Sequence, residues 1–181
     1  MFELTYNCSA KCIHCFNDGA ARESDETSKR NRKELTLNDY KRIIDELYSL
    51  GLYRVCLTGG DPFSKPEVWE ILDYLYNKNI VFDIYTNGLS ITHSVDRLRS
   101  LYPRLVGISI YSADEMVHDK ITRVNGSLKR TLQTVKDIGR YGIPMAFKCV
   151  IFKTNVKSYQ TVESLAKEHG AVLQYEVNLS N

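Results

Sequence analysis

Hydrophobic residues follow two alternating patterns along the chain, and together these patterns predict a repeating order of strand and helix. Short apolar runs predict strands at residues 2–6, 55–58, 81–86, 105–111, 145–152 and 172–177. Between them, apolar residues at helical spacing predict helices that begin at residues 36 and 66, and further helices near 94–101, 128–141 and 156–169. This order predicts a parallel sheet whose strands are joined by right-handed helical crossovers.

The number of predicted elements narrows the α/β fold class. Six strands and five helices are fewer than a closed TIM barrel contains. We therefore expect a partial (β/α)6 TIM-like barrel that ends at strand six, with a flat doubly wound sheet as the alternative. One face of each later strand is the more polar, and it includes Ser109, Lys148 and Glu176. That face is either exposed to solvent or lines a polar lumen, and the lumen is favoured because parallel sheets are normally covered on both faces.

Length and charge exclude several classes of protein. At 181 residues the chain is about one average domain long. Its formal net charge of +2 gives no basis for binding nucleic acid, and no apolar run approaches the roughly 20 residues of a membrane helix. Free thiols without an export signal indicate a cytoplasmic protein. Residues 22–34 are charged at nine of thirteen positions, so we expect a mobile, solvated loop there.

Three cysteines, Cys8, Cys12 and Cys15, form a C-x3-C-x2-C motif just after the first predicted strand. Three thiolates can hold a four-iron cluster and leave one iron open, whereas electron-transfer clusters usually have four cysteine ligands. A structural zinc ion would need a fourth ligand, and a haem c site would need histidine where Phe16 stands. The odd total of five cysteines disfavours a disulfide framework. An iron–sulfur cluster is therefore favoured, with zinc as the alternative.

A second motif, Gly59-Gly60-Asp61-Pro62, follows the second predicted strand. Ligands of parallel α/β folds bind at the carboxyl ends of the strands, where this turn and the cysteine motif both lie. Consecutive glycines let the backbone approach a ligand closely. Taken alone, however, such a sequence is more often an ordinary turn.

Together these motifs resemble those of the radical S-adenosylmethionine (radical SAM) superfamily. The cysteine motif, with His14 just before its third cysteine, resembles the signature of that family. Gly59 to Pro62 is similar to its Gly-Gly-Glu-Pro turn. Residues 108–127 and 149–155 resemble the fourth- and fifth-strand regions of its peptide- and protein-modifying members, which often carry SPASM or twitch domains.

The resemblance implies two cofactors and a radical reaction. Cys8, Cys12 and Cys15 would ligate a 4Fe–4S cluster whose open iron chelates S-adenosylmethionine. Reduction by an electron donor such as a flavodoxin or ferredoxin would yield a 5′-deoxyadenosyl radical, which abstracts hydrogen from a peptide or protein substrate. The further cofactor contacts that the resemblance implies are Gly59, Gly60 and Asp61 to the amino group, Ser109 to the ribose or carboxylate, His14 to the adenine, and Arg123 to the carboxylate. For Arg123, a solvated arginine at a helix end is an equally good interpretation.

The resemblance also bears on the extent of the chain. Peptide-modifying members often continue past the sixth strand into a cysteine-rich domain. We therefore expect residues 1–181 to be a radical SAM core domain truncated at its C-terminus, rather than a minimal member that works with a partner. The alternatives to an enzyme are a non-catalytic iron–sulfur or zinc-binding scaffold and a redox relay.

Overall fold

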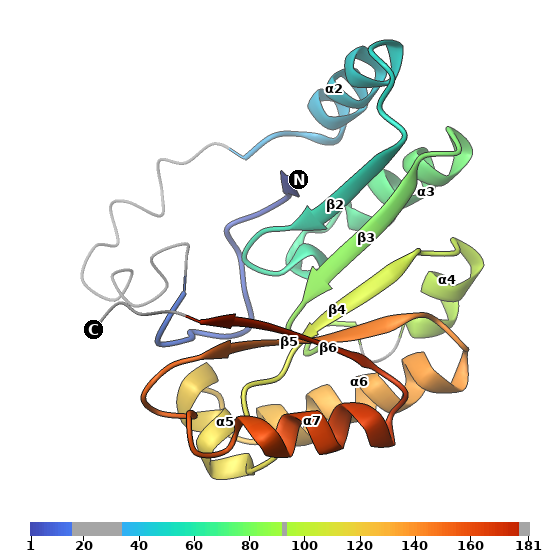
Figure 1. Cartoon of the computed structure of the whole chain (residues 1–181). Coiled ribbons are helices and arrows are strands. Elements are labelled where there is room, and N and C mark those ends of the chain that lie inside the picture. Colours follow the sequence, from blue (N-terminus) through green and yellow to red (C-terminus); the bar gives the residue numbers. More distant parts are fainter. Residues whose placement is uncertain (16–33, 92–93, 178–181) are drawn as a thin grey trace, which may run out of the picture.

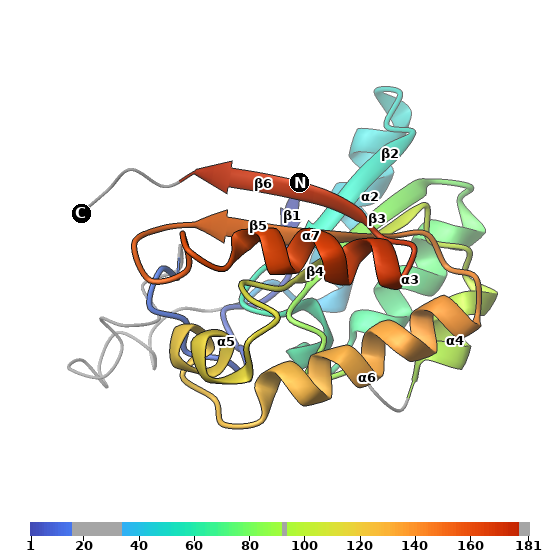
Figure 2. The same ribbon diagram turned by 60° about the horizontal axis from the view of Figure 1, so that its bottom comes forward.

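A curved parallel sheet with helices along its outer side forms the body of the protein (Figure 1, Figure 2). The computed structural model describes residues 1–15, 34–91 and 94–177. The strands are β1 (Phe2–Glu3), β2 (Arg54–Thr58), β3 (Val81–Thr86), β4 (Leu105–Ser109), β5 (Met145–Ile151) and β6 (Val172–Val177). The helices are α2 (Leu37–Ser49), α3 (Val68–Asn77), α4 (Val95–Ser100), α5 (Glu115–Thr122), α6 (Ser127–Arg140) and α7 (Tyr159–Glu168), with a short 3-10 turn, η2 (Pro62–Ser64).

The six predicted strands and five predicted helices are all present, with ends that differ by a few residues. The predicted charged loop at residues 22–34 lies outside the described residues, except for Glu34.

Helix α5 was not predicted. It has eight residues, EMVHDKIT, and its N-cap is Asp114, whose carboxylate accepts hydrogen bonds from the amides of Met116 and Val117. Its few apolar residues are interrupted by charged and polar ones and show no clear helical period.

The strand order decides between the two predicted architectures. The order is β1-β2-β3-β4-β5-β6, and every pair is parallel. A doubly wound sheet reverses its strand order at one point. Here each right-handed crossover runs in the same direction, so the helices gather on one face of the sheet. Among the described strands, β1 pairs only with β2 and β6 only with β5, which confirms an open, partial barrel.

The hydrophobic core lies between the sheet and this helical layer. Ile84, Ile108 and Phe147 project from the outer face of the sheet and are fully buried. Helix α3 covers them from one side with Ile71, and the core continues through α6 and α7. Helix α2 begins with a capping box in which Thr36 and Asp39 exchange hydrogen bonds. No helix in the described part of the chain has the length and apolar character needed to cross a membrane.

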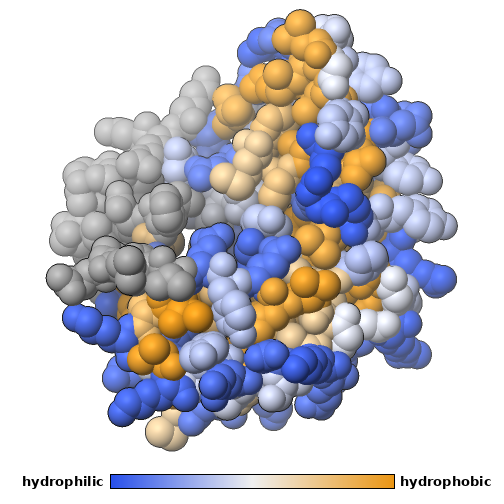
Figure 3. All heavy atoms as spheres, viewed as in Figure 1, coloured by the Kyte–Doolittle hydropathy of each residue, from blue (hydrophilic) through white to orange (hydrophobic). Residues whose placement is uncertain are grey.

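The inner face of the sheet, which no helix of the described residues covers, is polar as predicted. Ser109 lies beside Lys148 in the register of β4 and β5, and Lys148 lies beside Gln174 of β6. The Nζ atom of Lys148 donates to Oε1 of Gln174 at 3.0 Å and lies 3.8 Å from Glu176. It also lies 4.5 Å from the centre of the Tyr85 ring. Hydrophilic residues gather across the middle of this face (Figure 3), so the predicted inward orientation of Lys148 and Glu176 is confirmed.

A buried carboxylate organises the other half of the inner face. Asp83 on β3 has a side chain that is only 2% exposed, and its Oδ2 atom accepts hydrogen bonds from Arg54 at 2.6 Å and Arg104 at 2.7 Å. Two guanidinium groups on one oxygen offset the cost of removing this carboxylate from water. The half-buried Cys56 pairs with Asp83 in the register of β2 and β3.

Gly107 on β4 provides the space that the Tyr85 ring occupies on the inner face. A Cβ atom at position 107 would lie 2.7 Å from Cδ1 of Tyr85 and 3.3 Å from Cγ of Lys148.

We expect Gly107→Ala to lower the free energy of unfolding by about 1–3 kcal/mol, because the Tyr85 ring must leave its position. The matched control is Gly139→Ala in α6, where the nearest atom is Cε of Met145 at 3.4 Å. That change should be neutral or stabilising by up to about 1 kcal/mol. Urea denaturation measures both, and equal losses would contradict the assigned packing.

Candidate active site

The loop that carries the three cysteines, residues 4–15, is joined to the Gly-Gly turn by backbone hydrogen bonds. The amide of Gly60 donates to the carbonyl of Thr5 at 2.7 Å. The next amide, that of Asp61, donates to the carbonyl of Asn7 at 2.9 Å. The turn after β2 therefore fixes the chain immediately before Cys8.

The other half of the loop is joined to the end of α5. The amide of Lys11 donates to the carbonyl of Thr122 at 3.0 Å, and the amide of Ile13 donates to that of Ile121 at 2.9 Å. These carbonyls belong to the last turn of the helix, where backbone acceptors have no partner within the helix. Helix α5, which the sequence pattern did not predict, thus holds the segment between Cys8 and Cys15.

The two glycines of the turn are required by this joint. Gly59 has φ of 146°, and a Cβ atom there would lie 2.5 Å from the carbonyl oxygen of Thr5. A Cβ atom on Gly60 would lie 2.7 Å from the carbonyl oxygen of Tyr6 and would also overlap that of Asn7. The close approach is therefore between two segments of the protein itself. Because the amides of the turn are engaged, its carbonyl groups are the ones suited to receive a ligand's amino group.

Asp61 directs its side chain into the protein, toward the end of β3. Its carboxylate is completely buried. Oδ2 accepts from the hydroxyl of Thr86 at 2.7 Å and the amide of Asn87 at 2.9 Å, while Oδ1 accepts from the amide of Phe63 at 3.0 Å. Burial raises the pKa of Asp61, and these three hydrogen bonds oppose that rise. Asp61 can therefore contact a cofactor only through its backbone.

Tyr111 connects the end of β4 to the cysteine loop. Its ring is buried, and its hydroxyl group lies close to the side chains of Ser109 and Cys12. The edge of the His14 ring meets this tyrosine, with the ring centres 4.7 Å apart, and Phe152 lies 5.1 Å from His14. The predicted residues Ser109, His14 and Cys12 are thus brought together around Tyr111, to which the sequence assigned no role.

His14 has an unusual environment for an imidazole. Within the part of the chain that the structure describes, its buried Nδ1 atom has no hydrogen-bond partner. Burial lowers the pKa of His14, so the neutral ring is favoured. A neutral imidazole with one free nitrogen can stack on or hydrogen-bond to a bound ring.

The three thiols form a donor set suited to iron. Burial raises the pKa of Cys8, and burial together with Cys8 and Cys15 raises the pKa of Cys12 to about 12. The thiols of Cys8 and Cys12 therefore keep their protons until a metal displaces them. Among the described residues, no three Cys, His, Asp or Glu side chains converge on a position for one metal ion. A 4Fe–4S cube does not need such convergence, because each cysteine binds a different iron, and three thiols on one loop fit it.

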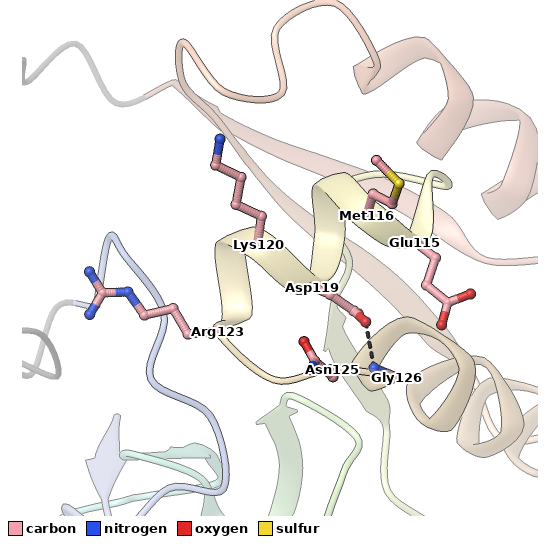
Figure 4. A pocket seen from close by; sticks show the side chains of 7 residues that line it. All are labelled: Glu115, Met116, Asp119, Lys120, Arg123, Asn125 and Gly126. Carbon is pink, nitrogen blue, oxygen red and sulfur yellow. Dashed lines mark hydrogen bonds between the residues drawn. The ribbon is translucent and has the colours of Figure 1, made fainter.

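Arg123 lies at the C-terminal end of α5 in a left-handed conformation, with φ of 56°. Its side chain is exposed and extends away from the helix (Figure 4). It borders a shallow hollow of about 640 Å³ on the outside of α5. In this hollow Asp119 turns toward the amide of Gly126, so its carboxylate caps the next helix instead of facing a ligand. The hollow is lined by Glu115, Met116, Asp119, Lys120, Arg123, Asn125 and Gly126.

Two residues of the site, Asn87 and Tyr111, were not predicted from the sequence to belong to it. Asn87 follows β3 directly, and its side-chain Nδ2 atom lies 3.3 Å from Sγ of Cys8. An Asn-Gly pair is typical of a turn, and its proximity to Cys8 depends on the pairing of β1, β2 and β3. Polar residues at the end of a predicted parallel strand were the available signal.

Comparison with known proteins identifies relatives of this chain. The sequence model of the Radical SAM superfamily matches residues 2–166. The AdoMet-dependent heme synthase of Methanosarcina barkeri is 32% identical over 172 residues, which are 94% of this chain and 47% of that protein. The mycofactocin maturase MftC of Mycobacterium tuberculosis is 31% identical over 175 residues, which are 96% of this chain and 42% of that protein.

Solved structures show the same fold. Streptococcus suis SuiB matches with a TM-score of 0.81 and 18% identity, over 99% of this chain and 39% of SuiB. SuiB bound to S-adenosylmethionine and SuiB bound to its precursor peptide SuiA match with TM-scores of 0.76 and 0.78. The chain spans less than half the length of each of these relatives.

Substitution of Asp61 tests the contribution of its buried carboxylate to stability. In Asp61→Asn, an amide NH2 replaces one carboxylate oxygen, so a donor faces either the Phe63 amide or the Thr86–Asn87 pair. We expect a loss of about 1–3 kcal/mol in the free energy of unfolding. The matched control is Asp114→Asn, because asparagine caps a helix about as well as aspartate. Melting curves of both variants measure the effect, and a similar loss in each would show that Asp61 is not specially required.

The buried imidazole of His118 makes the stability of the protein sensitive to acid. His118 on α5 is buried, and its Nδ1 atom accepts from the amide of Tyr111 at 3.3 Å. Burial lowers the pKa of His118 from 6.5 to about 4. Between these pH values the unfolded chain binds a proton that the folded chain does not, so stability falls as the pH falls. The loss at pH 4 is on the order of 3 kcal/mol.

His118→Gln keeps an acceptor for Tyr111 but cannot titrate, so it should flatten the pH dependence. Urea midpoints at pH 7 and pH 5 measure the difference. An unchanged dependence in the variant would assign the acid sensitivity to other groups.

Proposed function

The chain belongs to the radical SAM superfamily, and we propose that it cleaves S-adenosylmethionine reductively and uses the 5′-deoxyadenosyl radical to abstract hydrogen from a substrate. One observation carries this proposal. The cysteine loop, the Gly59-Gly60 turn and the end of the polar inner face meet at the carboxyl ends of the strands. That edge is where parallel α/β folds bind ligands.

Cys8, Cys12 and Cys15 are the proposed cluster ligands. A 4Fe–4S cluster held there supplies the electron for cleavage and an open iron for the cofactor's amino and carboxylate groups. The loop is fixed by the Gly-Gly turn on one side and by α5 on the other, so its cysteines keep their spacing without metal. Cys8 and Cys12 are also half-buried, which limits the access of bulk water to their sulfurs.

The cofactor contacts are proposed from the groups that remain available around the loop. The carbonyls of Gly59 and Gly60 can accept the amino group. The carbonyl of Asp61 already accepts from the amide of Ser64 at 2.9 Å and has a second lone pair for the same amino group. Ser109 presents a hydroxyl at the end of β4 for the ribose or carboxylate. The free nitrogen of His14 suits a contact with the adenine. Arg123 can pair with the cofactor's carboxylate from the end of α5.

A peptide or protein is the proposed substrate, and a flavodoxin or ferredoxin the proposed electron donor. MftC is a maturase, and SuiB has been solved with its precursor peptide. The inner face of this sheet carries groups that can bind a peptide backbone, among them Gln174 and the partly exposed Lys148. The heme synthase relative makes a tetrapyrrole the alternative to test.

The experiment is anaerobic reconstitution with iron and sulfide, followed by S-adenosylmethionine and dithionite. Wild-type protein should bind about four irons per chain and release 5′-deoxyadenosine, measured by mass spectrometry. Cys12→Ala should lose both, because a cube needs its third thiolate. Cys56→Ala should keep its iron, because Cys56 lies in the middle of β2, away from the cysteine loop.

Two outcomes would oppose the proposal. Equal iron loss from Cys12→Ala and Cys56→Ala would remove the cluster assignment. A full cluster without any 5′-deoxyadenosine would favour a scaffold or a redox relay. If 5′-deoxyadenosine is released, deuterium transfer into it from a labelled peptide or a labelled tetrapyrrole identifies the substrate class.

A further inference from the structure

Asn87 contacts a cysteine that is proposed to bind the cluster. It follows β3 directly, and its Nδ2 atom lies 3.3 Å from Sγ of Cys8, within hydrogen-bond reach of a sulfur acceptor. The same nitrogen lies 3.3 Å from the hydroxyl of Ser9. No other side-chain amide contacts a loop cysteine among the hydrogen bonds of the described residues.

The orientation of the Asn87 amide is fixed by its own turn. Its Oδ1 atom accepts from the amide of Leu89 at 2.8 Å. Since that partner can only donate, the oxygen of the side chain must face Leu89 and the NH2 group must face Cys8. The assignment of nitrogen and oxygen therefore follows from the hydrogen bonds and not from shape.

The backbone of Asn87 is fixed as firmly as its side chain. Its amide donates to the buried carboxylate of Asp61 at 2.9 Å, and its carbonyl accepts from the hydroxyl of Thr131 on α6 at 2.9 Å. An ordinary surface turn needs none of these contacts. Three parts of the fold converge to hold one NH2 group against one sulfur.

We propose that Asn87 is a positioning residue for the cluster, and that its N–H···S hydrogen bond to Cys8 raises the reduction potential of the cluster. This inference rests on the proposed function. Reduction adds one electron from an external donor, and the added negative charge is shared by the sulfurs. A donor aimed at a sulfur stabilises the reduced state more than the oxidised one. Without it, the same cluster is harder to reduce.

The test compares two substitutions in reconstituted protein by redox titration monitored with electron paramagnetic resonance. Asn87→Ala removes the donor without adding charge, and Asn87→Asp keeps the shape and the acceptor for Leu89 but presents an oxygen to Cys8. Both midpoint potentials should shift to more negative values, with the larger shift in Asn87→Asp. Iron and sulfide content should equal that of the wild type.

Asn38→Asp is the matched control for added charge, because Asn38 is exposed on α2. Its midpoint potential should equal that of the wild type. Ser9→Ala removes the hydroxyl beside Asn87 and leaves the sulfur contact, so it too should leave the potential unchanged.

The outcomes separate this inference from the proposed function. Wild-type protein that binds no cluster refutes the proposed function itself. A wild-type cluster whose potential is unchanged in Asn87→Ala overturns the role of Asn87 and leaves the proposed function standing. If both variants lose iron at an unchanged melting temperature, control of the potential is also overturned, and Asn87 is required for assembly instead.

Discussion

The site depends on one buried carboxylate. Asp61 is removed from water, which costs several kcal/mol for an ionised group, and it recovers that cost through three hydrogen bonds worth about 1.5–3 kcal/mol each. The two contributions nearly cancel, so the main effect of Asp61 is geometric. Its side chain fixes the end of β3, while its own amide holds Asn7. The cysteine loop and the turn after β3 therefore share one anchor.

The direction of the crossovers determines where this anchor lies. Because the strands follow one another in sequence order, helices cover one face and the other face remains free for polar groups. Lys148 and Asp83 find hydrogen-bond and ion-pair partners within that free face. The carboxyl ends of all the strands then lie along one edge, where loops from distant parts of the sequence can meet.

Much of this could be predicted from sequence, because the deciding signals are local. Periodicity located six strands, and the spacing of Cys8, Cys12 and Cys15 indicated the chemistry. The glycines were located correctly, but their close contact is with residues 5–7 of the same chain, which no local pattern can reveal. Helix α5 was missed because charged and polar residues interrupt its few apolar ones, which leaves no clear helical period. Asn87 was not predicted as a site residue, since its proximity to Cys8 requires the pairing of three strands.

The backbone contacts of the cysteine loop also set an order of events during synthesis. The cysteines are synthesised before helix α5, yet their loop is completed by hydrogen bonds to Ile121 and Thr122 of that helix. Domains generally fold as units during synthesis. The loop can therefore make these contacts only after α5 has emerged from the ribosome. Until then the three thiols lack this support and are open to oxidation and to stray metals, so a cluster bound by them would be inserted late in the maturation of the protein.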